Sequence, residues 1–147
     1  AHGWLMIALD VNVLVAAVHS SANAHDQTRT WLERVIAAPE PVGISDAVLT
    51  GALRVLTHSR IFDPPVRIDR AVEVLGRIVD HPGVVILNPL PGYWDQLRRL
   101  CVESQATGNL VADAGHAAVA IQHGAVFVTR DRDFARFAGL RWQPPGD

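Results

Sequence analysis

Four aspartates occupy positions where the neighbouring residues should be buried: Asp10, Asp113, Asp131 and Asp133. Asp10 ends the apolar run LMIALD, Asp113 interrupts LVADAGHAAVAI, and the last pair follows AVFV in AVFVTRDRDF. A carboxylate removed from water without a partner loses several kcal/mol or takes up a proton. Mg²⁺ or Mn²⁺ removes that difficulty, because hard cations take oxygen ligands and supply positive charge. The four aspartates therefore predict a divalent-metal site.

Asp10 has a second explanation that the sequence leaves open. It lies between a predicted strand and a predicted helix, where an aspartate commonly caps the first helical turn. Asn12, in the same D-V-N motif, could be a plain turn residue, or it could hydrogen-bond a metal-bound water or a neighbouring carboxylate. We assign Asn12 and Thr129 to the shell of residues that supports the metal ligands.

Asp113 is the most informative aspartate because it shares a helical face with apolar residues three or four positions apart. On a helix over 110–123, that face also carries Ala117 and Ala120, where an exposed carboxylate is not expected. The alternative is a place in the first helical turn, where the positive end of the helix stabilises an acid. His116 lies one turn from Asp113 and could contact it, but helix packing is the favoured role for this histidine.

Asp131 and Asp133 follow the fourth predicted strand in the motif V-T-R-D-R-D-F. Taken alone, they are ordinary solvated turn acids between arginines. The end of this strand should, however, lie beside the end of the first strand, which carries Asp10. We therefore predict Asp131 as a metal ligand and Asp133 as a fourth ligand, a cap or a supporting residue.

The pattern of apolar residues predicts strands that alternate with helices along the whole chain. The predicted strands cover 5–9, 42–44, 84–87, 125–128 and a last short segment near 140–142, and the predicted helices cover 13–18, 25–38, 46–57, 68–79, 93–105 and 110–123. This alternation predicts an α/β fold with a mainly parallel sheet covered on both faces. In such sheets, binding sites form beyond the carboxyl ends of the strands.

Length and composition indicate one domain, over 6–147. The chain has 147 residues, of which 49% are hydrophobic, enough to bury a core without disulfides. Residues 1–5 are interpreted as a tag remnant or a misassigned start, with Met6 as a plausible initiator. The single Cys101 excludes an internal disulfide, and the apolar runs are too short to cross a bilayer. We expect a cytoplasmic protein without a membrane segment.

The charged residues exclude several function classes. A net charge of −2 argues against general polyanion binding, so any contact with nucleic acid must be local. All the basic residues are arginine, and the lack of lysine excludes Schiff-base chemistry and lysine-dependent phosphate binding. The chain has no H-E-x-x-H, G-x-S-x-G, Walker or Rossmann motif, so zinc-protease, serine-nucleophile and nucleotide-cofactor chemistry lack support.

Three motifs, in this order, resemble those of PIN-domain ribonucleases: D-V-N after the first strand, L-V-A-D-A-G-H-A-A-V-A with H-G closing that helix, and V-T-R-D-R-D-F-A-R-F-A-G-L-R-W. More narrowly, the chain from Met6 to Trp142 resembles the VapC toxins of bacterial toxin–antitoxin pairs. The resemblance implies a three-layer α/β/α domain whose acidic pocket binds Mg²⁺ or Mn²⁺. It also implies hydrolysis of RNA, usually a tRNA or rRNA, until a cognate VapB antitoxin blocks the site. By motif position, Asp10, Asp113 and Asp131 match the family's catalytic, metal-binding acids.

One position departs from the family pattern. The family commonly carries a glutamate in the helix after the second strand, in a pattern like V-L-x-E-x-x-R-V, whereas this chain has Gly51 there. Asp46 is five residues away and rotated by about 140° on an ideal helix, so we do not expect it to replace the glutamate. The site is then either a working one, completed by Asp133 and water, or a weak or inactive module that binds RNA or antitoxin. We favour the working site.

Substrate and partner contacts are less well defined by the sequence. An acidic pocket needs a local basic rim to admit RNA, and ordinary solvation or antitoxin contact explains the same arginines equally well. The candidate RNA-binding residues near the motifs are Arg54, Arg60, Arg130, Arg132 and Arg136. The resemblance further implies a homodimer, for which Trp31 and Trp94 are surplus apolar residues. A phosphoacceptor signalling domain is a weaker alternative, because such a domain normally needs a lysine at its site and this chain has no lysine.

Overall fold

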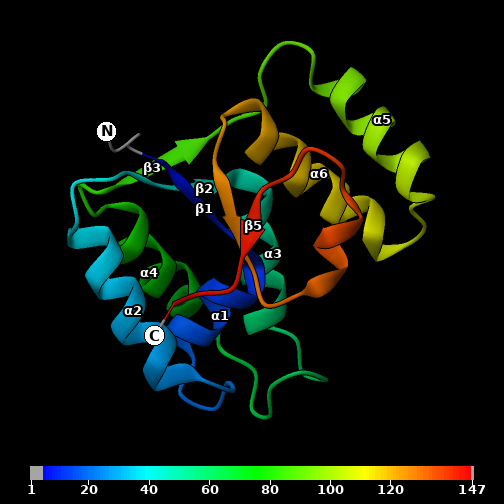
Figure 1. Cartoon of the computed structure of the whole chain (residues 1–147). Coiled ribbons are helices and arrows are strands. Elements are labelled where there is room, and N and C mark those ends of the chain that lie inside the picture. Colours follow the sequence, from blue (N-terminus) through cyan, green and yellow to red (C-terminus); the bar gives the residue numbers. More distant parts are fainter. Residues whose placement is uncertain (1–4, 147) are drawn as a thin grey trace.

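The computed structural model describes residues 5–146, and its elements alternate between strands and helices along the chain (Figure 1). The strands are β1 (Ile7–Leu9), β2 (Val42–Ser45), β3 (Val84–Leu87), β4 (Val126–Val128) and β5 (Trp142–Gln143). The α-helices are α1 (Val11–Val18), α2 (His25–Ala37), α3 (Asp46–Leu56), α4 (Ile68–Val79), α5 (Tyr93–Ser104) and α6 (Asn109–Gln122), and a 3₁₀ helix, η1, covers Arg132–Arg136.

Every strand and helix predicted from the sequence is present, with ends that differ by at most two residues. Only η1 was not predicted, because five residues of 3₁₀ helix give no apolar period to detect. The interpretation of residues 1–5 as a tag remnant or misassigned start concerns mainly residues 1–4, which lie outside the described part of the chain.

The strands form one sheet in the order β3-β2-β1-β4-β5, and each pairing seen in residues 5–146 is parallel. The predicted α/β class with a mainly parallel sheet is therefore confirmed. From β1 the chain adds β2 and β3 on one side, and then β4 and β5 on the other. This reversal makes the carboxyl ends of β1 and β4 the place where such sheets bind ligands.

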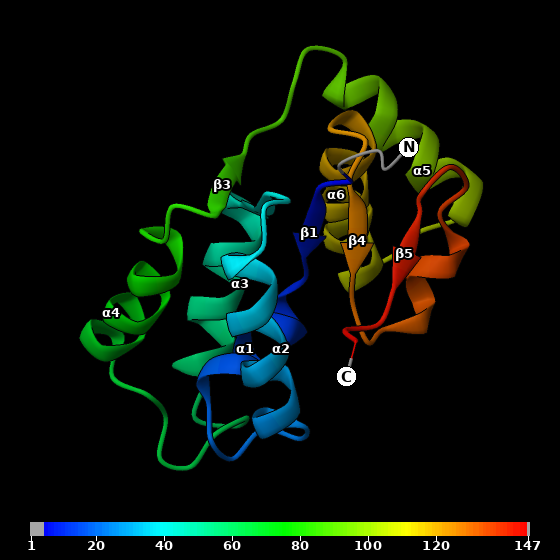
Figure 2. The ribbon, with the colours of Figure 1, turned by 60° about the vertical axis from the view of Figure 1, so that its left-hand side comes forward.

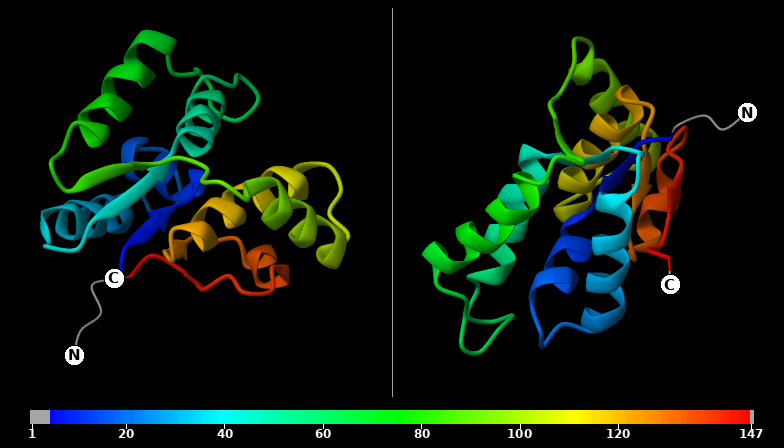
Figure 3. Two further views of the ribbon diagram at one scale, coloured as in Figure 1. Left: turned by 90° about the horizontal axis from the view of Figure 1, so that it is seen from above. Right: turned by 90° about the vertical axis from the view of Figure 1, so that its left-hand side faces the viewer.

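Helices cover both faces of the sheet, which gives the predicted three layers. α1, α2, α3 and α4 lie on one side of the strands, and α5 and α6 lie on the other (Figure 2). η1 lies on the same side as α5 and α6 (Figure 3), where Phe134 is completely buried. None of the helices over residues 5–146 has the length and apolar character that a membrane span requires.

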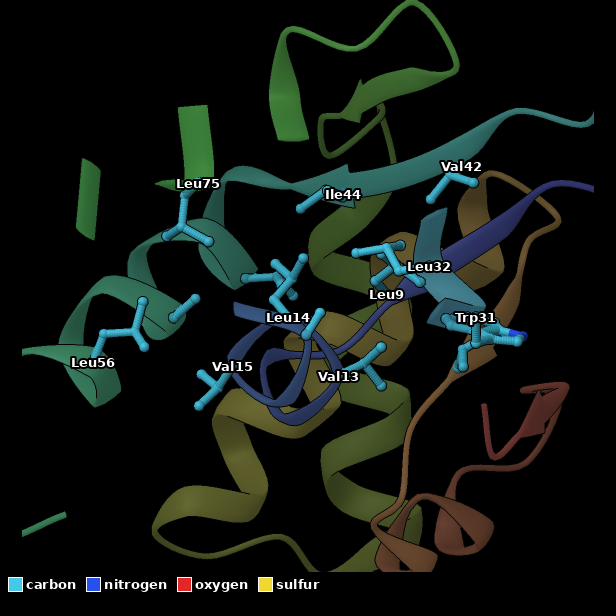
Figure 4. Packing of buried hydrophobic residues seen from close by; sticks show 14 of the residues in the cluster. Leu9, Val13, Leu14, Val15, Trp31, Leu32, Val42, Ile44, Leu56 and Leu75 are labelled. Carbon is cyan, nitrogen blue, oxygen red and sulfur yellow. The ribbon is translucent and has the colours of Figure 1, made fainter. Parts of the chain in front are cut away.

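Each face of the sheet has its own apolar core. One core joins Leu9 and Ile44 of the sheet to Leu14 of α1 and Trp31 of α2 (Figure 4). The other joins Phe127 of the sheet to helices α5 and α6 and to η1. Trp31 is only 5% exposed, so it belongs to the core and is not a surplus apolar residue available for a dimer contact. The alternating sides of the short strands produce both cores, because successive strand residues point to opposite faces.

α1 and α3 pack closely at one point, and the contact depends on a glycine. A Cβ built on Gly51 of α3 would lie 2.8 Å from Cγ2 of Val11 in α1. Val11 is β-branched, so its side chain has little freedom to move away. Gly51 thus sets the spacing between the two helices.

We predict that Gly51→Ala destabilises the fold, although alanine is the better helix former. Overpacking costs about 1–3 kcal/mol, and helix propensity returns at most about 1 kcal/mol. Urea unfolding should therefore show a net loss. Gly76 in α4 is the matched control, because no heavy atom lies within 4 Å of its built Cβ. Gly76→Ala should stabilise by roughly 0.5–1 kcal/mol, and an equal gain at both positions would contradict the close contact at Gly51.

Candidate metal centre

The register of β1 and β4 brings the first acid and its main partner together. Leu9 pairs with Val128, and the amide of Asp10 donates to the carbonyl oxygen of Val128 at 3.0 Å. The residues that follow these two strands, Asp10 and Thr129, therefore lie side by side although 119 positions separate them. Parallel pairing alone produces this neighbourhood, as the sequence predicted.

Asp10 is buried, with 4% of its surface exposed, and its carboxylate is held by three donors. Oδ1 accepts from the Val11 amide at 2.7 Å, which is the helix-cap contact considered from the sequence. Oδ2 accepts from the Thr129 hydroxyl at 2.7 Å and from Asn12 Nδ2 at 3.2 Å. Burial raises the pKa of Asp10, while the hydrogen bonds from Thr129 and Val11 act against that rise. Capping and a metal role are therefore compatible, since Oδ1 keeps a lone pair.

Thr129 and Asn12, the two residues expected to support the ligands, both hydrogen-bond Asp10. Thr129 is completely buried, and its Oγ1 accepts from Asn12 Nδ2 at 3.1 Å and from the Asp131 amide at 3.0 Å. Asn12 Oδ1 accepts from the Arg130 amide at 3.3 Å. These bonds fix the path of the chain from β4 into the loop that carries Asp131.

Asp131, rather than Asp133, caps the short helix η1. Its Oδ1 accepts from the Asp133 amide at 2.9 Å, and the side chain lies in the wall of the acidic cleft described below. Asp133 is exposed and is not part of that wall, although its charge acts on Asp113. Of the two acids, the geometry favours Asp131 as a ligand.

Asp113 differs from Asp10 and Asp131 because, among residues 5–146, no hydrogen-bond donor or cation pairs with it. It is the fifth residue of α6, so the first-turn placement considered from the sequence does not apply. Burial, followed by the charges of Asp10, Asp131 and Asp133, raises its pKa to about 6. Of these acids, Asp113 would be stabilised most by a bound cation, since no group in the described chain offsets its negative charge.

Three of the predicted acids face one cleft of about 1190 Å³, although they come from different ends of the chain. Asp10 and Asp131 come from the ends of β1 and β4, and Asp113 comes from α6 on the other face of the sheet. The cleft thus runs over the carboxyl edge of the sheet and is walled by helices of both layers. Apolar side chains in its wall include those of Val11, Val15, Phe62, Tyr93 and Leu97.

A fourth acid in the cleft was not predicted. Asp46 is the first residue of α3, after the cap Ser45, and it lies in the cleft wall together with Gly51. The wall extends around the first turn of α3, so Asp46 borders the cleft although it does not share a helical face with Gly51. A glutamate at position 51 would instead have to displace Val11, whose Cγ2 lies 2.8 Å from a Cβ built there.

His116 was assigned to packing, but it also faces the acids. It lies in the cleft wall, one turn after Asp113, and its buried Nδ1 has no hydrogen-bond partner in the described part of the chain. Burial lowers the pKa of His116, and the charge of Asp10 acts in the opposite direction. Packing explains the burial of the ring but not the unpaired nitrogen. A histidine three residues after an acid on one helix was the available signal.

The five arginines proposed for RNA binding separate into two groups. Arg54 and Arg130 lie in the cleft wall. Arg60, Arg132 and Arg136 are exposed and lie elsewhere on the described surface. The basic rim near the acids is thus smaller than the sequence suggested.

The residues present fit a hard divalent cation. Within residues 5–146, no group of three or more His, Cys, Asp or Glu side chains forms a ready-made metal-binding cluster. Mg²⁺ does not require one, because it retains several waters and often binds through one or two carboxylates. The carboxylate oxygens of the cleft and the unpaired charge of Asp113 match that preference.

We predict that Asp113→Asn raises the melting temperature in the presence of chelator. The folded-state pKa of about 6 lies above the usual 3.8, so the stability linked to this group is fully present below pH 3.8 and is lost as the pH rises through 6. At pH 7.5 the variant should melt higher, by about 2–4 °C per kcal/mol of repulsion removed. At pH 4 the difference should be much smaller. Asp26→Asn, at an exposed position in the first turn of α2, is the control and should not raise the melting temperature at pH 7.5.

Comparison with known proteins shows the family to which the chain is related. The PIN domain family matches residues 7–140. VapC ribonuclease Mb2897 of Mycobacterium bovis is 38% identical over 97% of both chains, and ribonuclease VapC31 of Mycobacterium tuberculosis is 38% identical over 95% of this chain and 99% of its own.

Two solved structures have the same fold. VapBC2 from Rickettsia felis, bound to a DNA fragment from its promoter, has a TM-score of 0.71 with 19% identity, and covers 95% of this chain and 98% of that one. Mycobacterium tuberculosis VapC20, described as a toxin that cleaves the sarcin–ricin loop, has a TM-score of 0.68 with 20% identity, and covers 92% and 98%. With its sheet order, its acidic cleft and its extended similarity to these relatives, the chain belongs to the PIN-domain family and, within it, to the VapC group.

Proposed function

We propose that this protein is a metal-dependent ribonuclease toxin that hydrolyses phosphodiester bonds of RNA and is neutralised by a cognate antitoxin. The observation that carries the proposal is the meeting of Asp10, Asp113 and Asp131 in one cleft. The similarity to VapC ribonucleases over nearly the whole chain supports the same function.

The chain's own residues prepare the site in two ways. Thr129, Asn12 and the Val11 amide hold Asp10 in one position, so its free lone pair has a defined direction. Asp113 contributes a carboxylate whose charge no residue of the described chain offsets. Asp10 thus supplies a ligand in a fixed position, and Asp113 supplies the uncompensated charge that attracts a cation.

A bound Mg²⁺ or Mn²⁺ would make a coordinated water more acidic and would offset negative charge that develops on the phosphate. Asp10, Asp113 and Asp131 would hold this cation, with Asp46 on the α3 side of the cleft. No side chain then needs to act as a nucleophile. Hydrolysis of this kind leaves 5′-phosphate and 3′-hydroxyl ends and does not use the 2′-hydroxyl.

The partners follow from the same proposal. A VapB-type antitoxin would cover the cleft, and an arginine of the antitoxin could pair with the acids and exclude both cation and substrate. The solved neighbours include VapBC complexes, which supports such a partner. We further propose tRNA or rRNA in the cytoplasm as substrate and a homodimer as the assembly. Trp94, which is 66% exposed on α5, remains available for a dimer contact, whereas Trp31 does not.

The alternative of an inactive binding module rested on Gly51. The presence of Asp46 in the cleft weakens it, because the α3 wall does carry an acid. A decayed enzyme would also have no physical reason to keep Asp113, whose charge destabilises the fold without a cation.

We predict that the purified protein cleaves RNA with Mg²⁺ or Mn²⁺ and stops when chelator is added. Asp113→Asn should lower the cleavage rate by at least about 100-fold, the upper end of the effect of losing a residue that supports a ligand. End analysis of the fragments should give 5′-phosphates. Asp95→Asn, at an exposed ion pair of α5, is the control and should leave the rate unchanged.

Two results would contradict the ribonuclease proposal. The first is cleavage that survives Asp113→Asn in protein freed of contaminating nuclease. The second is a cyclic phosphate at the fragment ends, because that product requires attack by the 2′-hydroxyl.

We predict that Asp46→Asn weakens cation binding. Mg²⁺ and Mn²⁺ should raise the melting temperature of the wild type, and the variant should need more cation for the same rise. Asp69→Asn is the matched control, because Asp69 occupies the first turn of α4 as Asp46 occupies that of α3. Both variants lose about 0.3–1 kcal/mol of helix-end stabilisation, but only Asp46→Asn should change the response to cation. Equal responses would exclude Asp46 from the site.

A further inference from the structure

Arg130 is a cation in the cleft wall that does not pair with the acids around it. It lies between Thr129 and Asp131 in the loop after β4. Its Nη2 donates instead to the Thr28 hydroxyl of α2, at 2.6 Å. Among the described residues, ion pairs engage six other arginines: Arg29, Arg67, Arg70, Arg77, Arg98 and Arg99. The charge of Arg130 thus remains uncompensated within a few residues of the acidic cluster.

The contact with Thr28 is well defined. Thr28 is completely buried, and its hydroxyl proton is committed to the carbonyl oxygen of Ala24, at 2.7 Å. Because a hydroxyl has one proton, the oxygen can only accept from Arg130. The guanidinium is held at one nitrogen by a neutral acceptor, which fixes its position without cancelling its charge.

The backbone of Arg130 is fixed as well. Its amide donates to Asn12 Oδ1 at 3.3 Å, and Asn12 also donates to Asp10. The segment that carries Arg130 is therefore tied to the same residue that holds the first acid. Partial burial lowers the pKa of Arg130, which shows that the group has lost part of its water without gaining an anion.

A phosphate is the anion that this arrangement lacks. A guanidinium has five N–H donors in a planar fork, and within residues 5–146 the side chain of Arg130 makes one hydrogen bond, to Thr28. Phosphate oxygens accept such donors in pairs, and the bonds are charge-assisted. RNA that enters an acidic cleft on a chain of net charge −2 also needs a nearby cation to offset repulsion.

We propose that Arg130 binds a backbone phosphate of single-stranded RNA at the acidic cleft, and that Thr28 is the positioning residue that holds its guanidinium for this contact. The inference rests on the proposed ribonuclease function and deepens it. It assigns Arg130 alone of the five candidate arginines to a contact beside the acids. It also gives α2, through Thr28, a part in substrate binding.

Binding of RNA in the presence of chelator tests the proposal without cleavage. The probe is a short fluorescein-labelled single-stranded RNA of mixed sequence, followed by anisotropy over a series of salt concentrations. Arg130→Gln should weaken binding by at least about 10-fold. It should also reduce the slope of log K against log salt by about 0.7, the value for one phosphate contact on a single strand. Arg132→Gln, an exposed neighbour outside the cleft wall, should leave both nearly unchanged.

The role of Thr28 is tested separately, because Arg130→Gln could also disturb the fold. Thr28→Val keeps the shape of the side chain and the charge of Arg130. It should therefore leave the salt slope unchanged and weaken binding by about 2–10-fold, as expected for one neutral hydrogen bond. In cleavage assays it should raise KM and not kcat. Thr28→Ser, which restores the hydroxyl, should return both values towards the wild type.

The outcomes distinguish this inference from the function on which it rests. An unchanged salt slope in Arg130→Gln, or an equal loss in Arg132→Gln, would overturn the phosphate contact while metal-dependent cleavage still stood. Wild-type binding by Thr28→Val would overturn the positioning role. Failure of the wild-type protein to bind or cleave any RNA would overturn both the inference and the proposed function.

Discussion

The hydrogen bond from the Thr129 hydroxyl to Asp10 is the contact on which the rest of the site depends. It is 2.7 Å long, and Thr129 is completely buried. It joins the ends of β4 and β1, gives a buried carboxylate a donor, and leaves the Thr129 oxygen to accept from Asn12 and from the Asp131 amide. Without this donor, the buried carboxylate would keep only the Val11 amide and Asn12 Nδ2, and its burial would be less fully offset. The loop that carries Asp131 would lose its anchor at the same time.

Helices cover both faces of the sheet, which explains why the site forms at the carboxyl edge of the strands. α1 and α3 belong to one core and α6 to the other, and the sheet separates them everywhere except beyond the ends of its strands. Asp10 and Asp46 reach the edge from the first side, and Asp113 reaches it from the second. The unfavourable charge of Asp113 is thus a consequence of bringing both layers to one cleft. A cation in that cleft would stabilise the contact between layers.

The apolar pattern was sufficient to predict the fold class and nearly all elements, because each strand and helix is specified by residues close in sequence. The prediction that Asp10 and Asp131 lie together followed from parallel strands having their ends at one edge, whereas Asp113 was selected by its apolar helical face and by the family resemblance. What failed depended on packing between elements. The place of Asp46 in the cleft wall was missed because only one stripe of an ideal helix was considered, and the burial of Trp31 depends on how α2 packs. The link between Thr28 and Arg130 joins residues 102 positions apart, and no local pattern reports it.

The central claim is that these separate acids share one cation, and the most direct measurement is a crystal structure of the protein soaked in Mn²⁺. An anomalous difference map should show one or two peaks between Asp10, Asp113 and Asp131, each about 2.0–2.6 Å from carboxylate oxygens, the range of hard cations. The loss of these peaks in Asp113→Asn would agree with the account. An empty cleft in well-ordered crystals at saturating Mn²⁺, or peaks only elsewhere on the surface, would contradict it.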